Sequence, residues 1–156
     1  MIRKHKKYRK PRKMFDKVRI EEEAELIKKY GLKNRTEIWK AESQVDSIRK
    51  KAKKLITAST EEQEKMFEKL RKMGFKVENM ADALALDKED WLKRRLQSLV
   101  VAKKIANTPK QARQFIVHKH IAINKNIMNA PSYIVPIAEE SNIELIKVAR
   151  KKEEKE

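Results

Sequence analysis

The segment between Asp90 and Glu139 contains no acidic residue, although the chain holds 23 Asp and Glu in all. Its basic side chains are interleaved with glutamines and asparagines. Arg donates to phosphate oxygens in pairs, Lys supplies a point charge, and amides reach sugars or base edges. These residue types predict a surface that binds the phosphate backbone of a nucleic acid. The candidate nucleic-acid-binding residues of the segment are Lys93, Arg94, Arg95, Lys103, Lys104, Thr108, Lys110, Gln111, Arg113, Gln114, His118, Lys119, His120, Asn124 and Lys125.

The net charge of the whole chain points to the same kind of partner. The 40 Lys and Arg give a formal net charge of +17 and a pI near 10.0. Each cation that neutralises a phosphate releases a condensed counterion, which favours binding. A solvated lysine-rich surface, as heat-adapted proteins have, is the alternative. The uneven distribution of the charge favours a nucleic acid.

The first 15 residues are predicted to be a basic arm that orders only on a polyanion. They contain Pro11 and show neither a helical nor a strand period. Tyr8 and Phe15 have rings that can stack on bases. The candidate RNA contacts of the arm are Lys4, Lys6, Lys7, Tyr8, Arg9 and Arg12.

Other chemistries find little support. The chain has 2 glycines and no cysteine, which leaves no glycine-rich phosphate loop, thiol nucleophile or Cys-based zinc site. His118 and His120 have the spacing of half a metal site on a strand, but no further ligand is near. The other carboxylates lie among lysines at helical spacings, which is typical of surface pairing. We therefore expect no catalysis, no metal and no cofactor.

The sequence also bears on the compartment. No apolar run approaches the roughly 18 residues of a membrane span. The basic N-terminal residues are not followed by the apolar stretch of a signal peptide. We expect an intracellular, unprocessed protein with no membrane contact.

These candidate residues need elements to position them, and the first elements are helices. One helix is predicted over 16–30, because Asp16 can cap it and Gly31 can stop it. A second opens at residue 34 or 36, and a third lies over 59–73 before Gly74. The second helix carries one apolar stripe over about five turns, formed by Ile38, Ala41, Val45, Ile48, Ala52 and Leu55.

The remaining elements carry the candidate corner. One continuous helix is predicted over 88–104, and a further helix begins where Thr108 is the N-cap and Pro109 the first residue. The free N–H groups of that helix, with Arg113 in its first turns, are expected to hold neighbouring phosphates. Alternating strand-like stretches follow at 120–124, 132–137 and 142–148. The predicted fold is α+β, a helical bundle followed by a small helix-helix-antiparallel-sheet domain.

Two stretches of the chain resemble a known family. "RRLQSLVVAKKIANTPKQARQFIVHKHIAINKNIMNAPSYIV", residues 94–135, is similar to the RNA-binding domain named after small-subunit ribosomal protein four. "YRKPRKMFDKVRIEEEAELIKKYGLKNRTEIWKAES", residues 8–43, resembles the archaeal and eukaryotic form of that family. The positions that match the motif are Arg94 and Arg95 in the first helix, Thr108 as cap, Ala112 and Arg113 in the second helix, and His120 and Asn124 in the strand.

Two lysines depart from the family pattern. Lys119 and Lys125 stand where the family usually has glycine. A lysine in the left-handed region costs of order 1 kcal/mol, so these residues signal either strain or a different turn.

The resemblance implies the organisation and function of the chain. It implies a basic arm (1–15), a helical domain (16–90), an RNA-binding domain (91–148) and a charged tail (149–156). The implied role is a non-catalytic rRNA-binding component of the small ribosomal subunit in the cytoplasm, which scaffolds or nucleates assembly near the path by which mRNA enters. The implied partners are small-subunit rRNA, neighbouring ribosomal proteins including small-subunit protein five, and mRNA. A pre-ribosomal RNA processing factor and the recognition module of an RNA-modifying enzyme remain alternatives.

Overall fold

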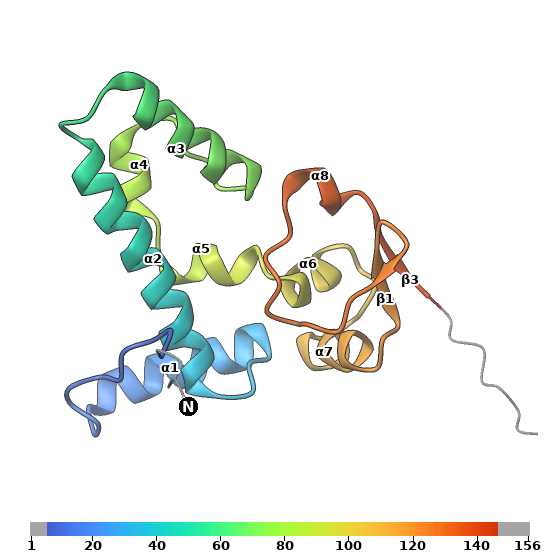
Figure 1. The fold of residues 1–156 in the computed structure, drawn as a ribbon. Coiled ribbons are helices and arrows are strands. Elements are labelled where there is room, and N and C mark those ends of the chain that lie inside the picture. The colour runs from blue at the N-terminus through green and yellow to red at the C-terminus, as the bar shows by residue number, and fades with distance from the viewer. Residues whose placement is uncertain (1–5, 147–156) are drawn as a thin grey trace, which may run out of the picture.

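The computed structural model describes residues 6–146, and within them it has the predicted α+β fold (Figure 1). The helical part consists of α1 (Lys17–Tyr30), α2 (Arg35–Leu55), α3 (Thr60–Lys72), α4 (Met80–Ala85) and α5 (Lys88–Lys93). The C-terminal part consists of α6 (Leu96–Ala102), α7 (Pro109–Val117), β1 (Ile121–Ile123), β2 (Asn126–Ile127), α8 (Ile137–Glu140) and β3 (Ile143–Leu145). Residues 147–148 of the expected RNA-binding domain and the tail 149–156 lie outside the described residues.

Helix α2 is the axis of the helical part, since α1, α3, α4 and α5 all pack against it. The predicted apolar stripe faces these neighbours, with Ile38, Ala41, Val45 and Ala52 buried. One core cluster joins α1, the first half of α2 and α5, and a second joins the rest of α2 to α3 and α4. Trp91 packs against both clusters, so α5 ties the two halves of the helical part together.

The predicted helix over 88–104 is wrong, because the chain breaks at Arg94 and Arg95 into α5 and α6. Arg95 is extended, with φ −71° and ψ 145°, and pairs with Ile134 in an isolated antiparallel bridge. The N–H of Leu96 donates to the Tyr133 carbonyl at 2.8 Å beside this bridge. A pairing partner almost forty residues away therefore overrides the local helical pattern. The expected strand at 132–137 is this single bridge, and α8 begins at its end.

Helix α4 was not predicted from the sequence, although its start carries a signal. The Asp82 carboxylate accepts hydrogen bonds from the N–H groups of Glu78 and Asn79 at 3.0 and 3.1 Å, and Asn79 completes a capping box. The spacing Asn-x-x-Asp was therefore sufficient to indicate a helix here.

The small sheet is antiparallel and has the strand order β2-β1-β3. Ile123 pairs with Asn126 across a two-residue turn, and Ile121 pairs with Leu145. The inner face of β1 contributes Ile121 and Ile123 to a separate core formed with α6 and α7. The predicted strands at 120–124 and 142–148 correspond to β1 and β3, and residues 147–148 lie outside the described residues.

Two contacts fix α1 against later elements. The Tyr30 hydroxyl donates to Glu89 of α5 at 3.0 Å, and Lys29 lies 2.7 Å from the same carboxylate. Burial, with this hydrogen bond, raises the pKa of Tyr30 to about 12. Among the described residues, no helix has the length and apolar character needed to cross a membrane.

Gly31 ends α1 at the place where the helical part meets α7. Its φ is +61°, and a Cβ built on it would lie 2.7 Å from the Cβ of Pro109 and 2.9 Å from Nε2 of Gln97. Both the left-handed backbone and the close approach therefore require glycine.

We predict that Gly31→Ala lowers the free energy of unfolding by roughly 2 to 3 kcal/mol, since a left-handed alanine is strained and an added methyl overpacks a filled site. Chemical denaturation monitored by circular dichroism measures this loss. Ala85→Gly, at an exposed helical position, is a control for a glycine–alanine exchange without a clash and should cost no more than about 1 kcal/mol. An unchanged stability of Gly31→Ala would contradict the close contact with α7.

Candidate nucleic-acid interface

The N-terminal end of α7 is exposed, and its first turn has no acidic residue to offset the positive end of the helix dipole. Oγ1 of Thr108 accepts from the Gln111 N–H at 3.2 Å, and Pro109 occupies the first turn as predicted. Gln111 returns its side-chain oxygen to the Asn107 N–H at 3.0 Å. Thr108 and Lys110 are exposed, and the first turn has no acid. The helix dipole and Lys110 therefore act on an approaching anion in the same sense.

Lysines occupy the left-handed position that follows α6 and α7. Lys104 has φ 58° and Lys119 has φ 63°. After α7, the Lys119 N–H donates to Ile116 at 3.0 Å and the His120 N–H donates to Phe115 at 2.9 Å, which is a Schellman motif. The same pair of bonds follows α6. Helix α3 ends with the same motif but has Gly74, φ 87°, at that position.

The turn between β1 and β2 also has a lysine in the left-handed conformation. Asn124 and Lys125 have φ values of 51° and 66°, as a two-residue hairpin of type I′ requires. The Asn124 carboxamide oxygen accepts from Asn142 at 2.6 Å, which stabilises the turn. Lys119 and Lys125 therefore occupy the left-handed positions where the family has glycine. Their backbone is strained there, and the turns themselves are unchanged. Lys104, Lys119 and Lys125 are all exposed.

The histidines lie beside the left-handed lysine that follows α7. The rings of His118 and His120 are 6.3 Å apart, and His120 meets Phe115 edge to face at 6.2 Å. Gln114 and His118 are exposed. Within residues 6–146 no group of three or more metal-ligating side chains is gathered.

Two of the candidate arginines and one lysine are engaged inside the fold. Arg94 donates to the carbonyls of Met73 at 3.0 Å and Val135 at 2.8 Å, and to the Glu140 carboxylate at 2.9 Å. The Arg95 side chain is 5% exposed and lies 2.5 Å from Glu37. Lys103 donates to the Glu140 carbonyl. The structure thus gives Arg94 and Arg95 a connecting role instead of the predicted surface position, whereas Lys93 is exposed and pairs with Asp90.

Arg113 is also turned away from the helix start where we expected it. Its guanidinium donates to Glu37 at 2.8 Å and lies 3.4 Å from the Gln97 side-chain oxygen. It cannot hold this position and also join phosphates at the first turn of α7. The sequence did not reveal this partner, because Glu37 lies 76 residues away.

Glu37, Arg95, Arg113 and Gln97 form one network, which we call the interdomain joint. Gln97 is 1% exposed and donates to the carbonyls of Tyr30, Gly31 and Pro109 at 3.1, 2.9 and 2.8 Å. Burial by itself raises the pKa of Glu37, but the hydrogen bonds and charges of Arg113 and Arg95 outweigh it and lower the pKa below its usual value. Glu37 is therefore ionised at neutral pH and joins α2 to α7.

Over its described residues the arm lies beside α2, and its disorder in the absence of a polyanion stays a prediction. Tyr8 meets Trp39 at a ring distance of 6.0 Å, so one of its faces is taken from base stacking. Phe15 is 94% exposed. The predicted contact Lys4 lies outside the described residues. Lys6, Lys7 and Arg9 line a shallow hollow with Lys50 of α2.

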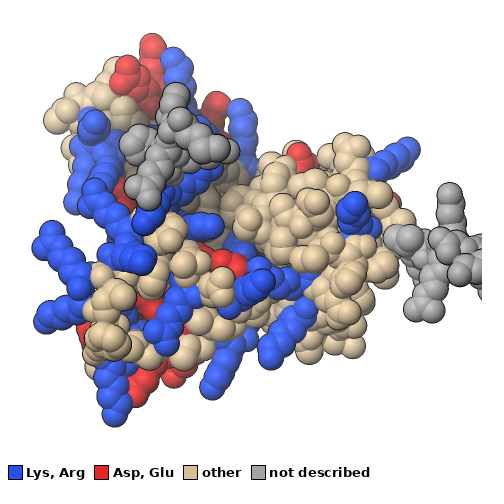
Figure 2. Space-filling view, turned by 60° about the horizontal axis from the view of Figure 1, so that its bottom comes forward, with Lys and Arg blue, Asp and Glu red and all other residues tan. Residues whose placement is uncertain are grey.

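The surface charge is wider than the predicted corner. Figure 2 shows Lys and Arg side chains gathered over the helical part and along its junction with the C-terminal part. Sequence reasoning missed Lys40 and Lys50, because it singled out the segment without acids, whereas α2 carries Glu37, Glu42 and Asp46 among its lysines. Only the fold shows that the arm lies beside these two lysines.

Comparisons with known proteins agree over most of the chain. Residues 94–140 match the S4 domain family. Small ribosomal subunit protein uS4 of Methanococcus aeolicus is 49% identical over 132 residues, which cover 80% of this chain and 75% of that protein. The protein of the same name from Methanococcus maripaludis is 41% identical over 90% of this chain and 83% of its own length. The one from Natronomonas pharaonis is 39% identical over 88% and 84%.

We predict that Glu37→Gln destabilises the protein at pH 7 by roughly 3 kcal/mol, because two arginines of a mostly buried network lose their carboxylate. The pKa of Glu37 is lowered in the folded protein, so its contribution is present above the unfolded pKa of about 4.5 and is lost as the pH falls through the folded pKa. Denaturation curves of both proteins between pH 3 and 7 test this. A difference that stays constant over that range would exclude ionised Glu37 as the cause.

We predict that replacing left-handed lysines by glycine stabilises the fold but weakens RNA binding. Lys104→Gly with Lys119→Gly should raise the free energy of unfolding by about 1 to 2 kcal/mol and weaken binding to structured RNA. The control is Lys104→Ala with Lys119→Ala, which removes the same charge but keeps the strain. It should weaken RNA binding equally without stabilising the fold. RNA affinity that is unchanged in both variants would remove these lysines from the interface.

Proposed function

Because the chain belongs to the small ribosomal subunit protein uS4 family, we propose that it binds small-subunit rRNA as a non-catalytic structural component of that subunit. The observation that carries the proposal is the placing of exposed lysines at three left-handed positions around α6, α7 and the hairpin. Lysine is unfavourable at such positions, and strained residues cluster at functional sites. Binding to a polyanion would explain why lysine occupies these positions, since the isolated fold gains no stability from it.

The proposed interface combines three elements. The start of α7 with Thr108 and Lys110, the left-handed lysines, and the exposed Gln114, His118 and Asn124 supply the C-terminal part. Lys6, Lys7, Arg9 and Arg12 of the arm, with Lys40 and Lys50 of α2, supply the helical part. Arg94, Arg95 and Arg113 act indirectly, since their hydrogen bonds hold these two surfaces in one fixed relation.

A fixed relation between two basic surfaces suits a scaffold. Because the two parts are already fixed relative to one another, little entropy of domain motion is lost on binding, and several RNA helices can be held at set angles. We propose on this ground that the protein helps small-subunit rRNA to assemble. Membership of the family supports a place in the cytoplasmic ribosome. By resemblance we further propose contact with small-subunit protein five and a position near the path of entering mRNA.

The two alternative functions receive less support. The similarity to uS4 proteins extends over both the helical and the C-terminal part. An RNA-modifying enzyme would share only the C-terminal part and would need a catalytic domain in addition. A processing factor would be released from the mature subunit, so the presence of this chain in purified mature subunits distinguishes it from a ribosomal protein.

We predict that the protein binds a small-subunit rRNA fragment more tightly than an unrelated RNA of equal length and that affinity falls steeply with salt. Lys110→Ala should weaken binding about 5- to 10-fold and reduce the salt slope by about 1, as expected for one lost phosphate contact. Filter retention at several salt concentrations measures both quantities.

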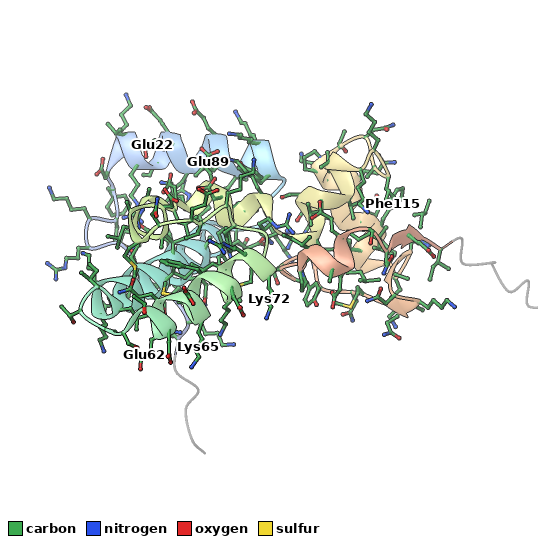
Figure 3. All side chains as sticks on the ribbon, turned by 90° about the horizontal axis from the view of Figure 1, so that it is seen from above. Glu22, Glu62, Lys65, Lys72, Glu89 and Phe115 are labelled. Carbon is green, nitrogen blue, oxygen red and sulfur yellow. The ribbon has the colours of Figure 1, made fainter. Side chains whose placement is uncertain are left out.

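Lys65→Ala is the matched control. Lys65 is an exposed helical lysine on α3 beside Glu62, at the other side of the molecule from Phe115 of α7 (Figure 3). Its loss should change affinity less than twofold. Equal losses from both variants would show that net charge alone acts, and a lack of preference between the two RNAs would overturn the proposed function.

A further inference from the structure

A cleft of about 580 Å³ lies between the helical part and the C-terminal part. Its lining includes Lys40, Ala41 and Gln44 of α2, Trp91 and Leu92 of α5, and Pro131, Ser132 and Ile134. Lys7 of the arm and the interdomain joint complete the lining. This volume is in the range of small-ligand sites and is far too small for a duplex.

The cleft is electropositive. Four cationic side chains, Lys7, Lys40, Arg95 and Arg113, line it together with one carboxylate, that of Glu37. The two arginines compensate Glu37 by direct hydrogen bonds. Glu37, the carboxylate in the lining of the cleft, forms its ion pairs with Arg95 and Arg113 and not with Lys7 or Lys40. An anion entering the cleft is therefore attracted.

One unpaired donor lies buried behind the lining of the cleft. The Nε of Arg95 is buried and has no hydrogen-bond partner among the residues that the structure describes. Its side chain is 5% exposed, and its Nη2 is already engaged by Glu37. A buried donor without an acceptor is costly in free energy, but this atom has no contact with solvent, so an anion in the cleft does not reach it unless the lining moves.

The remaining wall suits a planar apolar group. Trp91 stacks on Phe75 at 5.7 Å and an interplanar angle of 17°, which holds the indole ring rigid. Pro131 and Ile134 give further apolar surface, and Gln44 and Ser132 of the lining offer donors and acceptors. Rigid aromatic and apolar walls with a few polar groups are typical of sites for unpaired bases.

We propose that this cleft receives one unpaired nucleotide of the bound RNA, with its phosphate near Lys40 and Lys7 and its base against the Trp91 and Pro131 wall. The proposal rests on the proposed RNA-binding function and adds a single-stranded subsite to it. An acidic peptide would satisfy the cations, but it would leave the planar apolar wall and the Gln44 amide without a matching group. A nucleotide satisfies both.

The test uses the full chain and free nucleotides, which makes it independent of rRNA binding. The chain has 2 tryptophans, so Trp39→Phe leaves Trp91 as the sole indole reporter. Adenosine and uridine 5′-monophosphate should quench Trp91 fluorescence saturably in the millimolar range, and inorganic phosphate should compete at least fivefold more weakly. Calorimetry on the unmodified protein gives the same comparison without the Trp39 substitution.

A matched pair of lysines on α2 locates the site. Lys40→Ala should weaken nucleotide binding at least fivefold, whereas Lys53→Ala, the same change at an exposed position of the same helix outside the cleft, should change it less than twofold. Equal effects of the two variants, or no saturable binding up to about 20 mM, would overturn the proposal. Phosphate or a glutamate hexapeptide competing as well as the nucleotides would also overturn it.

The same variants separate this inference from the proposed function. If free nucleotides do not bind but the unmodified protein still retains the small-subunit rRNA fragment, the cleft proposal fails and the function stands. If nucleotides bind in the cleft while the rRNA fragment is not preferred over unrelated RNA, the proposed function fails and the cleft remains a nucleotide site.

Discussion

The contact on which the rest of the structure depends is the Glu37 carboxylate held between Arg95 and Arg113. It joins α2 to the start of α6 and to α7, and Gln97 beside it donates to three carbonyls from both parts of the chain. Removing charges from water is costly, so such a network is weak evidence for stability. Its stronger effect is geometric. An ion pair with several fixed donors admits few arrangements, and it thereby sets the angle between two basic surfaces whose separate cores share little apolar contact.

Local signals were sufficient for much of the fold. The stripe of α2, the glycine stop of α1 and the Thr108 cap of α7 depend on residues within a few positions of each other, and the structure contains all three elements. The break between α5 and α6 depends instead on Ile134, and the orientation of Arg113 depends on Glu37. No short window of sequence contains both partners of either contact. For the same reason the sequence indicated which residue types belong to the site but assigned three connecting arginines to its surface and missed the lysines of α2.

Backbone strain distinguishes the two parts of the molecule. Helix α3 ends with glycine in the left-handed position, where Gly74 lies against the guanidinium of Arg94 and any side chain would collide with it. Helices α6 and α7 end with lysine in the same motif, where the position faces solvent. Close packing therefore requires glycine at the left-handed position inside the molecule. On the proposed RNA surface the position holds lysine, whose charge can bind phosphate, although each left-handed lysine costs about 1 kcal/mol of stability.

The late position of β3 has a consequence for folding during synthesis. Strand β3 pairs with β1, Ile143 and Val135 complete the core of the C-terminal part, and Glu140 is the carboxylate partner of Arg94. The two cores of the helical part use no residue beyond Leu92, so all their members have been made well before Val135 and Ile143. The C-terminal part can close only when nearly the whole chain has been made, because its core needs residues on both sides of the hairpin. A nascent chain would thus present a folded helical part with its basic arm well before the corner around α7 is assembled. The order of synthesis would then also be the order in which the two surfaces become able to meet RNA.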